Sequence, residues 1–238
     1  MSTTQKTALI AQHVAIEWAK PGERARKIVR RSNLRVTGKF PSFRNNASVH
    51  WESFTERDCV IRLDADPRID SFKEQPATLT YVLNGKTYRH FPDLFVVGNG
   101  RAAFIEVKSH TDPDLCEAIE RGNALRPALL MQGFDYFVVT DLEIRHEPQF
   151  SDAKLLLQLG RNPVSDIRKE QLRRFFLRKP PRWRDIVSGS FGENAVFDVC
   201  RLLLEGYFSY DRRYALSADS VINATPFVAN SEESSTWL

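Results

Sequence analysis

Cysteine and methionine are scarce in this chain of 238 residues, which has three cysteines and two methionines. The cysteines, Cys59, Cys116 and Cys200, stand far apart along the chain. They therefore lack both the close pairing of a structural zinc site and the density of a disulfide framework in a small secreted domain. We expect three free thiols.

Long apolar runs are missing as well. No stretch reaches the roughly 18 consecutive apolar residues that a membrane helix needs, and the first residues contain no apolar signal core. These absences favour an intracellular protein. Neither an internal repeat nor a low-complexity tract is present. With 42% hydrophobic and 27% charged residues, the chain is typical of a globular protein with one large domain or two modest ones.

Charge is unevenly distributed, although the net charge is only +4. Residues 1–49 carry ten Lys and Arg against two Asp and Glu, and residues 160–185 carry nine against three. Residues 50–159 carry 12 against 18. Basic flanks suit a polyanion such as DNA, and an acidic middle suits carboxylates gathered around a metal ion. A solvated surface with irregular charge is the alternative.

Hydrophobic periodicity predicts an α/β fold with a mixed β-sheet and flanking helices. The pair Asn84-Gly85 is typical of a type I′ turn between two strands. Helices are expected over 4–19, 51–64, 113–130, 151–159 and 193–206, and strands over 69–73, 77–83, 87–97, 102–109 and 134–140.

The first 49 residues are expected to form a helix followed by a basic arm. Pro21-Gly22 ends the helix. An arm that lies on DNA phosphates and an ordinary basic surface segment are both compatible with this composition. The candidate DNA contacts are Arg24, Arg26, Lys27, Arg30, Arg31 and Arg35.

Residues 92–108 carry the clearest chemical signal, because two apolar strands flank a Gly-Asn-Gly turn. Asp93 opens the first strand, and Glu106 and Lys108 lie near the end of the second. Strand side chains alternate between faces, so Glu106 and Lys108 share one face. A tight hairpin returns Asp93 to their side. Two acids and a lysine beside apolar sequence suit a divalent metal ion and an activated water.

The hairpin predicts a Mg²⁺ site, in which Mn²⁺ would substitute. Asp93, Glu106 and the backbone carbonyl of Val107 are the candidate ligands. A bound metal ion lowers the pKa of its water and polarises a phosphate oxygen. Lys108 would orient that water or stabilise the developing negative charge. This is the chemistry of a metal-dependent DNA endonuclease.

Glu56 is the candidate third carboxylate, either as a direct ligand or through water. In the helix expected over 51–64, it lies on one stripe with Val60 and Leu63. A carboxylate beside an apolar face needs a partner, because an unpaired buried charge is costly. Glu52 is the alternative carboxylate, and a surface helix with ordinary acids is the other interpretation.

The C-terminal part has the order of a winged-helix unit. The helix expected over 193–206 is followed by strands at 207–210 and 214–216, separated by a short turn. Such a unit binds DNA or another protein, and a structural cap is the alternative. We expect four parts: 1–49 (N-terminal helix and arm), 50–150 (nuclease domain), 151–228 (winged-helix-like domain) and 229–238 (flexible tail).

Five short segments resemble, in chain order, the PD-(D/E)xK nuclease core of TnsA-type transposon endonucleases. Glu74-Gln75-Pro76 is the most discriminating of them, because most nucleases of the superfamily lack it. The resemblance implies a restriction-endonuclease-like core and a C-terminal winged-helix domain, and it covers about residues 50–225. The five segments are 55–58, 66–67, 72–76, 91–93 and 105–108.

The resemblance implies a subunit that cuts the 5′, non-transferred strands at transposon ends. A separate DDE-type transposase would cut and join the 3′ ends, and an AAA+ ATPase regulator would contact the C-terminal region. Carried over by motif, the active-site set is Glu56, Asp93, Glu106 and Lys108. Some family members have Gln at the position of Glu106. Glu is the better metal ligand, so this departure favours activity.

The resemblance also implies a location in the bacterial cytoplasm, at the nucleoid when the machinery is assembled. Two other functions stay open. The chain is either a different PD-(D/E)xK nuclease, of restriction or repair type, or a DNA-binding scaffold whose nuclease core has decayed. Intact acids and an intact lysine argue against decay.

Overall fold

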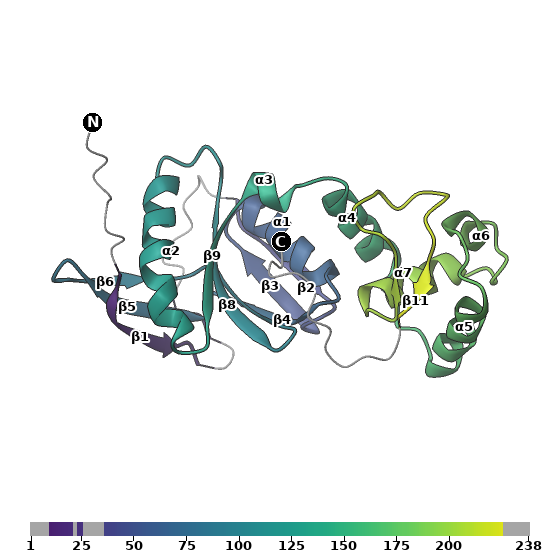
Figure 1. The fold of residues 1–238 in the computed structure, drawn as a ribbon, viewed down its shortest axis with the longest axis horizontal. Helices are drawn as coiled ribbons and strands as arrows, with labels where there is room; N and C mark the ends of the chain where they lie inside the picture. The colour runs from purple at the N-terminus through teal and green to yellow at the C-terminus, as the bar shows by residue number, and fades with distance from the viewer. Residues whose placement is uncertain (1–9, 21–22, 26–35, 226–238) are drawn as a thin grey trace, which may run out of the picture. The chain divides into compact units, whose positions relative to one another are not determined.

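The computed structural model describes residues 10–20, 23–25 and 36–225 (Figure 1). Its contacts divide the chain into two compact units. The first unit comprises residues 1–59 and 70–142, and the second comprises residues 60–69 and 143–238. Among the described helices, none combines the length and apolar character needed to cross a membrane. The expected division at residues 49, 150 and 228 stays a prediction.

The first unit contains an antiparallel sheet of three strands in the order β1-β5-β6. Asn84 and Gly85 have φ angles of 52° and 73° and join two of these strands in the expected tight hairpin. The strands are β1 (Gln12–Trp18), β5 (Ala77–Leu83) and β6 (Lys86–His90).

A mixed sheet of four strands has the order β4-β7-β8-β9. β7 and β8 are antiparallel and joined through Asn99-Gly100, which confirms the expected hairpin, and β8 and β9 are parallel. The α/β class expected from the sequence is thereby confirmed, with several sheets and helices. The strands are β4 (Ile69–Glu74), β7 (Leu94–Gly98), β8 (Arg101–Lys108) and β9 (Asp135–Thr140).

Helix α2 (Leu115–Leu130) lies beside β9 (Figure 1). Its buried residues include Ala118, Gly122, Leu125 and Leu129, which recur every three or four positions and form one face. Pro127 lies inside this helix rather than at its end. Below the helix, the core contains Phe104, Leu79 and Tyr136. This packing places one face of α2 against the strand that follows the predicted metal-binding hairpin.

The helix expected over residues 4–19 is wrong for the part of that range that the structure describes. Residues 12–18 form β1, which pairs with β5. Val14 and Ile16 are partly buried while Ala15 is exposed, a period of two rather than 3.6. The exposed edge of β5 offers backbone hydrogen bonds to this segment, so tertiary pairing overrides the local preference.

Two further expectations need correction. The end of the predicted basic arm is a hairpin of β2 (Gly38–Ser42) and β3 (Ala47–Trp51), turning at residues 43–46. The single strand expected over 87–97 is interrupted, and β6 and β7 lie in different sheets. Pro92, which has no N–H group to donate, occupies the break.

Helix α1 (Phe54–Ala65) crosses from the first unit to the second and matches the helix expected over 51–64. The second unit is mainly helical. A short helix, α3 (Asp141–Ile144), begins at its boundary. Its other helices are α4 (Gln149–Leu159), α5 (Asp166–Arg178), α6 (Trp183–Val187) and α7 (Ala195–Leu204).

The expected strand at residues 214–216 is wrong. β10 (Phe208–Ser209) pairs instead with β11 (Asn223–Ala224), after a long connection. Within that connection, the Leu216 N–H donates to the buried carboxylate of Asp152, so the segment is tied to a side chain rather than to a strand. The winged-helix assignment stays a prediction.

Candidate active site

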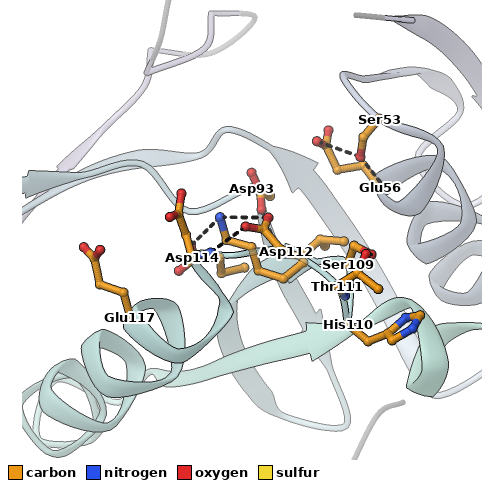
Figure 2. A network of polar contacts seen from close by, with 12 residues as sticks. Ser53, Glu56, Asp93, Ser109, His110, Thr111, Asp112, Asp114 and Glu117 are labelled. Atoms are coloured by element: carbon orange, nitrogen blue, oxygen red, sulfur yellow. Dashed lines mark hydrogen bonds and ion pairs between the residues drawn. The ribbon is translucent and has the colours of Figure 1, made fainter.

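The four residues of the predicted active-site set line one pocket of about 470 Å³ in the first unit. Asp93 precedes β7, Glu106 and Lys108 belong to β8, and Glu56 lies in the first turn of α1. Figure 2 shows Glu56 and Ser53 at the start of their helix, across from Asp93 and Asp112. The fold thus brings together side chains from two distant segments, while their catalytic roles stay predictions.

Two backbone N–H groups hold Asp93 in place. The Val107 backbone N–H donates to Asp93 Oδ2 at 2.7 Å, and the Gln75 N–H donates to the Asp93 carbonyl at 2.8 Å. Burial and the nearby Glu56 carboxylate raise the pKa of Asp93 to about 8, although the hydrogen bond from Val107 lowers it. Without a cation, Asp93 is therefore mostly protonated at neutral pH.

Glu106 is only 4% exposed and is held at both oxygens. Arg121 Nη2 lies 2.6 Å from Oε1, and the Tyr136 hydroxyl donates to Oε2 at 2.7 Å. Burial raises the pKa of Glu106, but His90, Tyr136 and Arg121 together bring it below its usual value. Glu106 is thus a carboxylate at neutral pH, in contrast to Asp93.

Lys108 lies between two acids at the mouth of the pocket. Its Nζ is 3.8 Å from Glu106 Oε1 and 3.6 Å from Asp112 Oδ2. The side chain is about one-fifth exposed, so its charge is partly shielded from water. Asp112 therefore helps to place the ammonium group beside Glu106, and the sequence reasoning overlooked this contact.

Glu56 also closes the first turn of α1. Its carboxylate accepts from the Glu52 N–H at 2.8 Å and from the Ser53 hydroxyl at 3.2 Å, while Ser53 Oγ accepts from the Glu56 N–H at 3.1 Å. This arrangement resembles a capping box, for which Ser-x-x-Glu is the sequence signal. Glu52 precedes the helix, accepts a hydrogen bond from Gln75 and lines the same pocket, so the choice of Glu56 over Glu52 as the third active-site carboxylate stays a prediction.

The pocket has acceptor capacity that the protein leaves unused. Gln75 Oε1 is buried and has no hydrogen-bond partner among the described residues. Burial and the neighbouring Glu56 carboxylate raise the pKa of Asp93. Buried acceptors and crowded carboxyl groups are stabilised by a hydrated divalent cation. The donor chemistry therefore fits Mg²⁺, with Val107 lining the same pocket.

The described carboxylates nevertheless do not converge on one point. Within residues 10–20, 23–25 and 36–225, no three His, Cys, Asp or Glu side chains form a cluster that could hold a metal ion. Glu106 faces Arg121 and Tyr136, and Glu56 faces its own helix start. Direct binding by all three acids would require side chains to rotate, whereas binding through water would require less movement.

The predicted DNA-contact set lies mostly outside the described residues. Only Arg24 is described, and its guanidinium lies 3.5 Å from the Glu74 carboxylate. The remaining members are Arg26, Lys27, Arg30, Arg31 and Arg35. A role of these residues in DNA binding stays a prediction.

Four residues of the site were missed by sequence reasoning as functional candidates: Gln75, His90, Arg121 and Tyr136. Gln75 has a φ of 41°, which is unusual for a residue other than glycine. Tyr136 carries the hydroxyl group in the otherwise apolar run Tyr-Phe-Val-Val, and a buried hydroxyl needs a partner. The need of the Tyr136 hydroxyl for a partner was therefore a signal in the sequence. Neither His90 nor Arg121 has a comparable signal in its neighbouring residues.

The segment that contains the β7–β8 hairpin matches a known protein family. Residues 66–141 match the family model described as TnsA-like endonuclease N terminal. The match includes Asp93, Glu106 and Lys108 but not Glu56 or the C-terminal part. No curated protein matches the chain.

The family match indicates a nuclease related to transposition, and such nucleases act with DNA and a transposase. The resemblance expected from the short motifs is thus confirmed over residues 66–141, which are similar to the N-terminal domain of TnsA-like endonucleases.

Proposed function

We propose that this chain is the Mg²⁺-dependent endonuclease subunit of a heteromeric transposase and cuts the 5′, non-transferred strands at transposon ends. One observation carries the proposal: Asp93, Glu106 and Lys108 of the matched domain line one pocket with Glu56. Its partners would be a DDE-type transposase and an AAA+ ATPase regulator. Mn²⁺ would substitute for Mg²⁺.

Some residues of the pocket would bind the metal ion, and Lys108 would stabilise negative charge. Asp93 and Glu106 would hold Mg²⁺, with the Val107 carbonyl and with Glu56 directly or through water. When bound, Mg²⁺ supplies an activated water and polarises a phosphate oxygen. Lys108, placed beside Glu106 and Asp112, would stabilise negative charge on the phosphate. Asp93 must first release its proton to become a ligand.

The decisive test is a strand-specific cleavage assay on DNA that carries a transposon end. The chain would be incubated with Mg²⁺, with and without the cognate transposase and ATPase, and each DNA strand would be labelled separately. We expect 5′-strand cutting only with the partners and only with the metal ion. Failure to cut with every partner and Mg²⁺ present would refute the proposal.

Two other outcomes of this assay would point elsewhere. Sequence-specific cutting of both strands by the chain alone would favour a restriction or repair nuclease. DNA binding without cutting would favour a decayed scaffold. The second alternative draws on one observation, namely that both Glu106 oxygens already accept hydrogen bonds from Arg121 and Tyr136.

A further inference from the structure

The Glu106 carboxylate is enclosed by side chains from three separate elements. Arg121 comes from α2, Tyr136 from β9 and His90 from the end of β6. The two oxygens have different neighbours. Oε1 faces the cations Arg121 at 2.6 Å and Lys108 at 3.8 Å. Oε2 accepts from Tyr136 at 2.7 Å, and His90 Nε2 lies 3.4 Å away.

The protons of this network can be assigned from its geometry. Tyr136 has one hydroxyl proton, and it is donated to the Glu106 carboxylate. His90 Nε2 lies 2.8 Å from the Tyr136 oxygen, so Nε2 must carry a proton and donate it there. The chain of donors runs from His90 through Tyr136 to Glu106.

Packing holds the Tyr136 ring in place. Tyr136 is 2% exposed and belongs to the core below α2. A Cβ atom on Gly122 would stand 3.2 Å from Tyr136 Cε1 and 3.1 Å from Val138 Cγ2, so the helix packs closely against β9 at the Tyr136 ring. The hydroxyl therefore has little freedom to follow Glu106 if that side chain rotates.

We propose that Tyr136 is a positioning residue for Glu106, with His90 holding the Tyr136 hydroxyl. Together they fix Oε2 and leave Oε1, on the side of Lys108 and the pocket, for a divalent cation. Arg121 balances the charge on Oε1 when no cation is bound. This inference rests on the proposed function. It assigns to Tyr136 and His90 the orientation of a metal ligand, without contact to the metal ion itself. Such outer hydrogen bonds fix the orientation of ligating groups.

Mn²⁺ binding to the full chain, followed by electron paramagnetic resonance or calorimetry, tests the proposal without any cleavage. We expect Tyr136→Phe to weaken Mn²⁺ affinity by about 10- to 100-fold. Tyr210→Phe is the matched control, because the Tyr210 hydroxyl donates to Asp152 at 2.8 Å in the second unit. It should change affinity by less than about twofold. Asp93→Asn should abolish binding, which confirms that the measured site is the pocket.

The outcomes separate this inference from the proposed function. If the unaltered chain binds Mn²⁺ through Asp93 but Tyr136→Phe binds equally well, the positioning role is wrong and the metal site stands. If the unaltered chain neither binds Mn²⁺ nor cuts DNA with its partners, both fail. Should Tyr136→Phe not fold, ¹⁵N NMR of the unaltered chain decides. A His90 ring protonated at Nε2 supports the donor chain, and one protonated only at Nδ1 overturns it.

Discussion

Each unit of the molecule contains a buried tyrosine that donates to a buried acid, and the surroundings of the two pairs differ. In the first unit, Tyr136 donates to Glu106, whose other oxygen faces Arg121 and Lys108. In the second unit, Tyr210 donates to Asp152, which also accepts the Leu216 N–H. The second acid is satisfied by neutral donors and ties a loop, whereas the first is surrounded by charge and lines the candidate active site.

The comparison teaches that burial of an acid does not by itself mark a catalytic group. A structural acid has neutral donors that would lose their acceptor if it were removed. Glu106 instead faces the cations Arg121 and Lys108 and shares its pocket with Asp93 and Glu56.

Asp93→Ala should abolish 5′-strand cutting, with a loss of at least about 1,000-fold in rate, because it removes a metal ligand. DNA affinity should stay within about twofold, since the side chain is an acid rather than a phosphate contact. Cleavage with all partners and an equilibrium binding titration measure the two quantities. Equal losses of cutting and binding would mean that the pocket is not catalytic.

Asp152→Ala should lower the free energy of unfolding by about 3 kcal/mol, because the Tyr210 hydroxyl and the Leu216 N–H would lose their acceptor. Chemical denaturation measures this change. Cutting by the folded fraction should be unaffected, in contrast to Asp93→Ala. A selective loss of cutting at full stability would place Asp152 among the functional acids.

The free energy of unfolding should also depend on pH through the ionisation of Asp93. Its folded pKa of about 8 lies above the unfolded value of roughly 3.9, so the unfolded chain releases this proton first. The stability contribution is therefore present below about pH 4 and is lost as pH rises towards 8. Between pH 5 and pH 9 in the presence of a chelator, the unaltered chain should lose roughly 1–3 kcal/mol more unfolding free energy than the Asp93→Asn variant does. An unchanged pH profile would refute the shifted pKa.

Smaller effects on stability are expected for two serines that begin helices. Ser53 precedes α1 in the first unit, and Ser165 precedes α5 in the second, where its hydroxyl accepts from the Arg168 N–H. Ser53→Ala and Ser165→Ala should each lower the free energy of unfolding by about 1 kcal/mol. Thermal denaturation of each variant and of the unaltered chain measures these changes.

Glu56→Gln separates capping from catalysis at the same helix start. Glutamine can serve in a capping box, so stability should change by less than about 0.5 kcal/mol. Cutting should nevertheless fall by about tenfold or more if the carboxylate holds the metal or its water. Unchanged cutting would leave Glu56 with the capping role alone.

Local signals account for the elements that the sequence predicted well. Asn99-Gly100 forces a two-residue turn, so β7 and β8 must pair as Gly98 with Arg101 and Leu94 with Ile105. The same logic applies to Asn84-Gly85. Side-chain alternation along β8 then places Glu106 and Lys108 on one face. These inferences needed only neighbouring residues, and the structure agrees with them.

Long-range pairing accounts for the errors. Residues 12–18 have apolar residues that suit either a helix or a strand, and the choice was made by β5, some 60 residues away. Residues 214–216 look like a strand, but the Leu216 N–H donates to Asp152 instead. The helical character of residues 166–178 was missed, although Ser165 caps that helix.

The hairpin, the α/β class and the candidate residues Asp93, Glu106 and Lys108 could be recognised from chain order, because turns and strand alternation act over a few residues. The contacts of the two acids and the shifts of their pKa values depend on the three-dimensional fold. Arg121, Tyr136 and His90 reach Glu106 from three elements, and burial with Glu56 sets the pKa of Asp93. Electrostatics and desolvation depend on distances in space, which chain order does not encode locally.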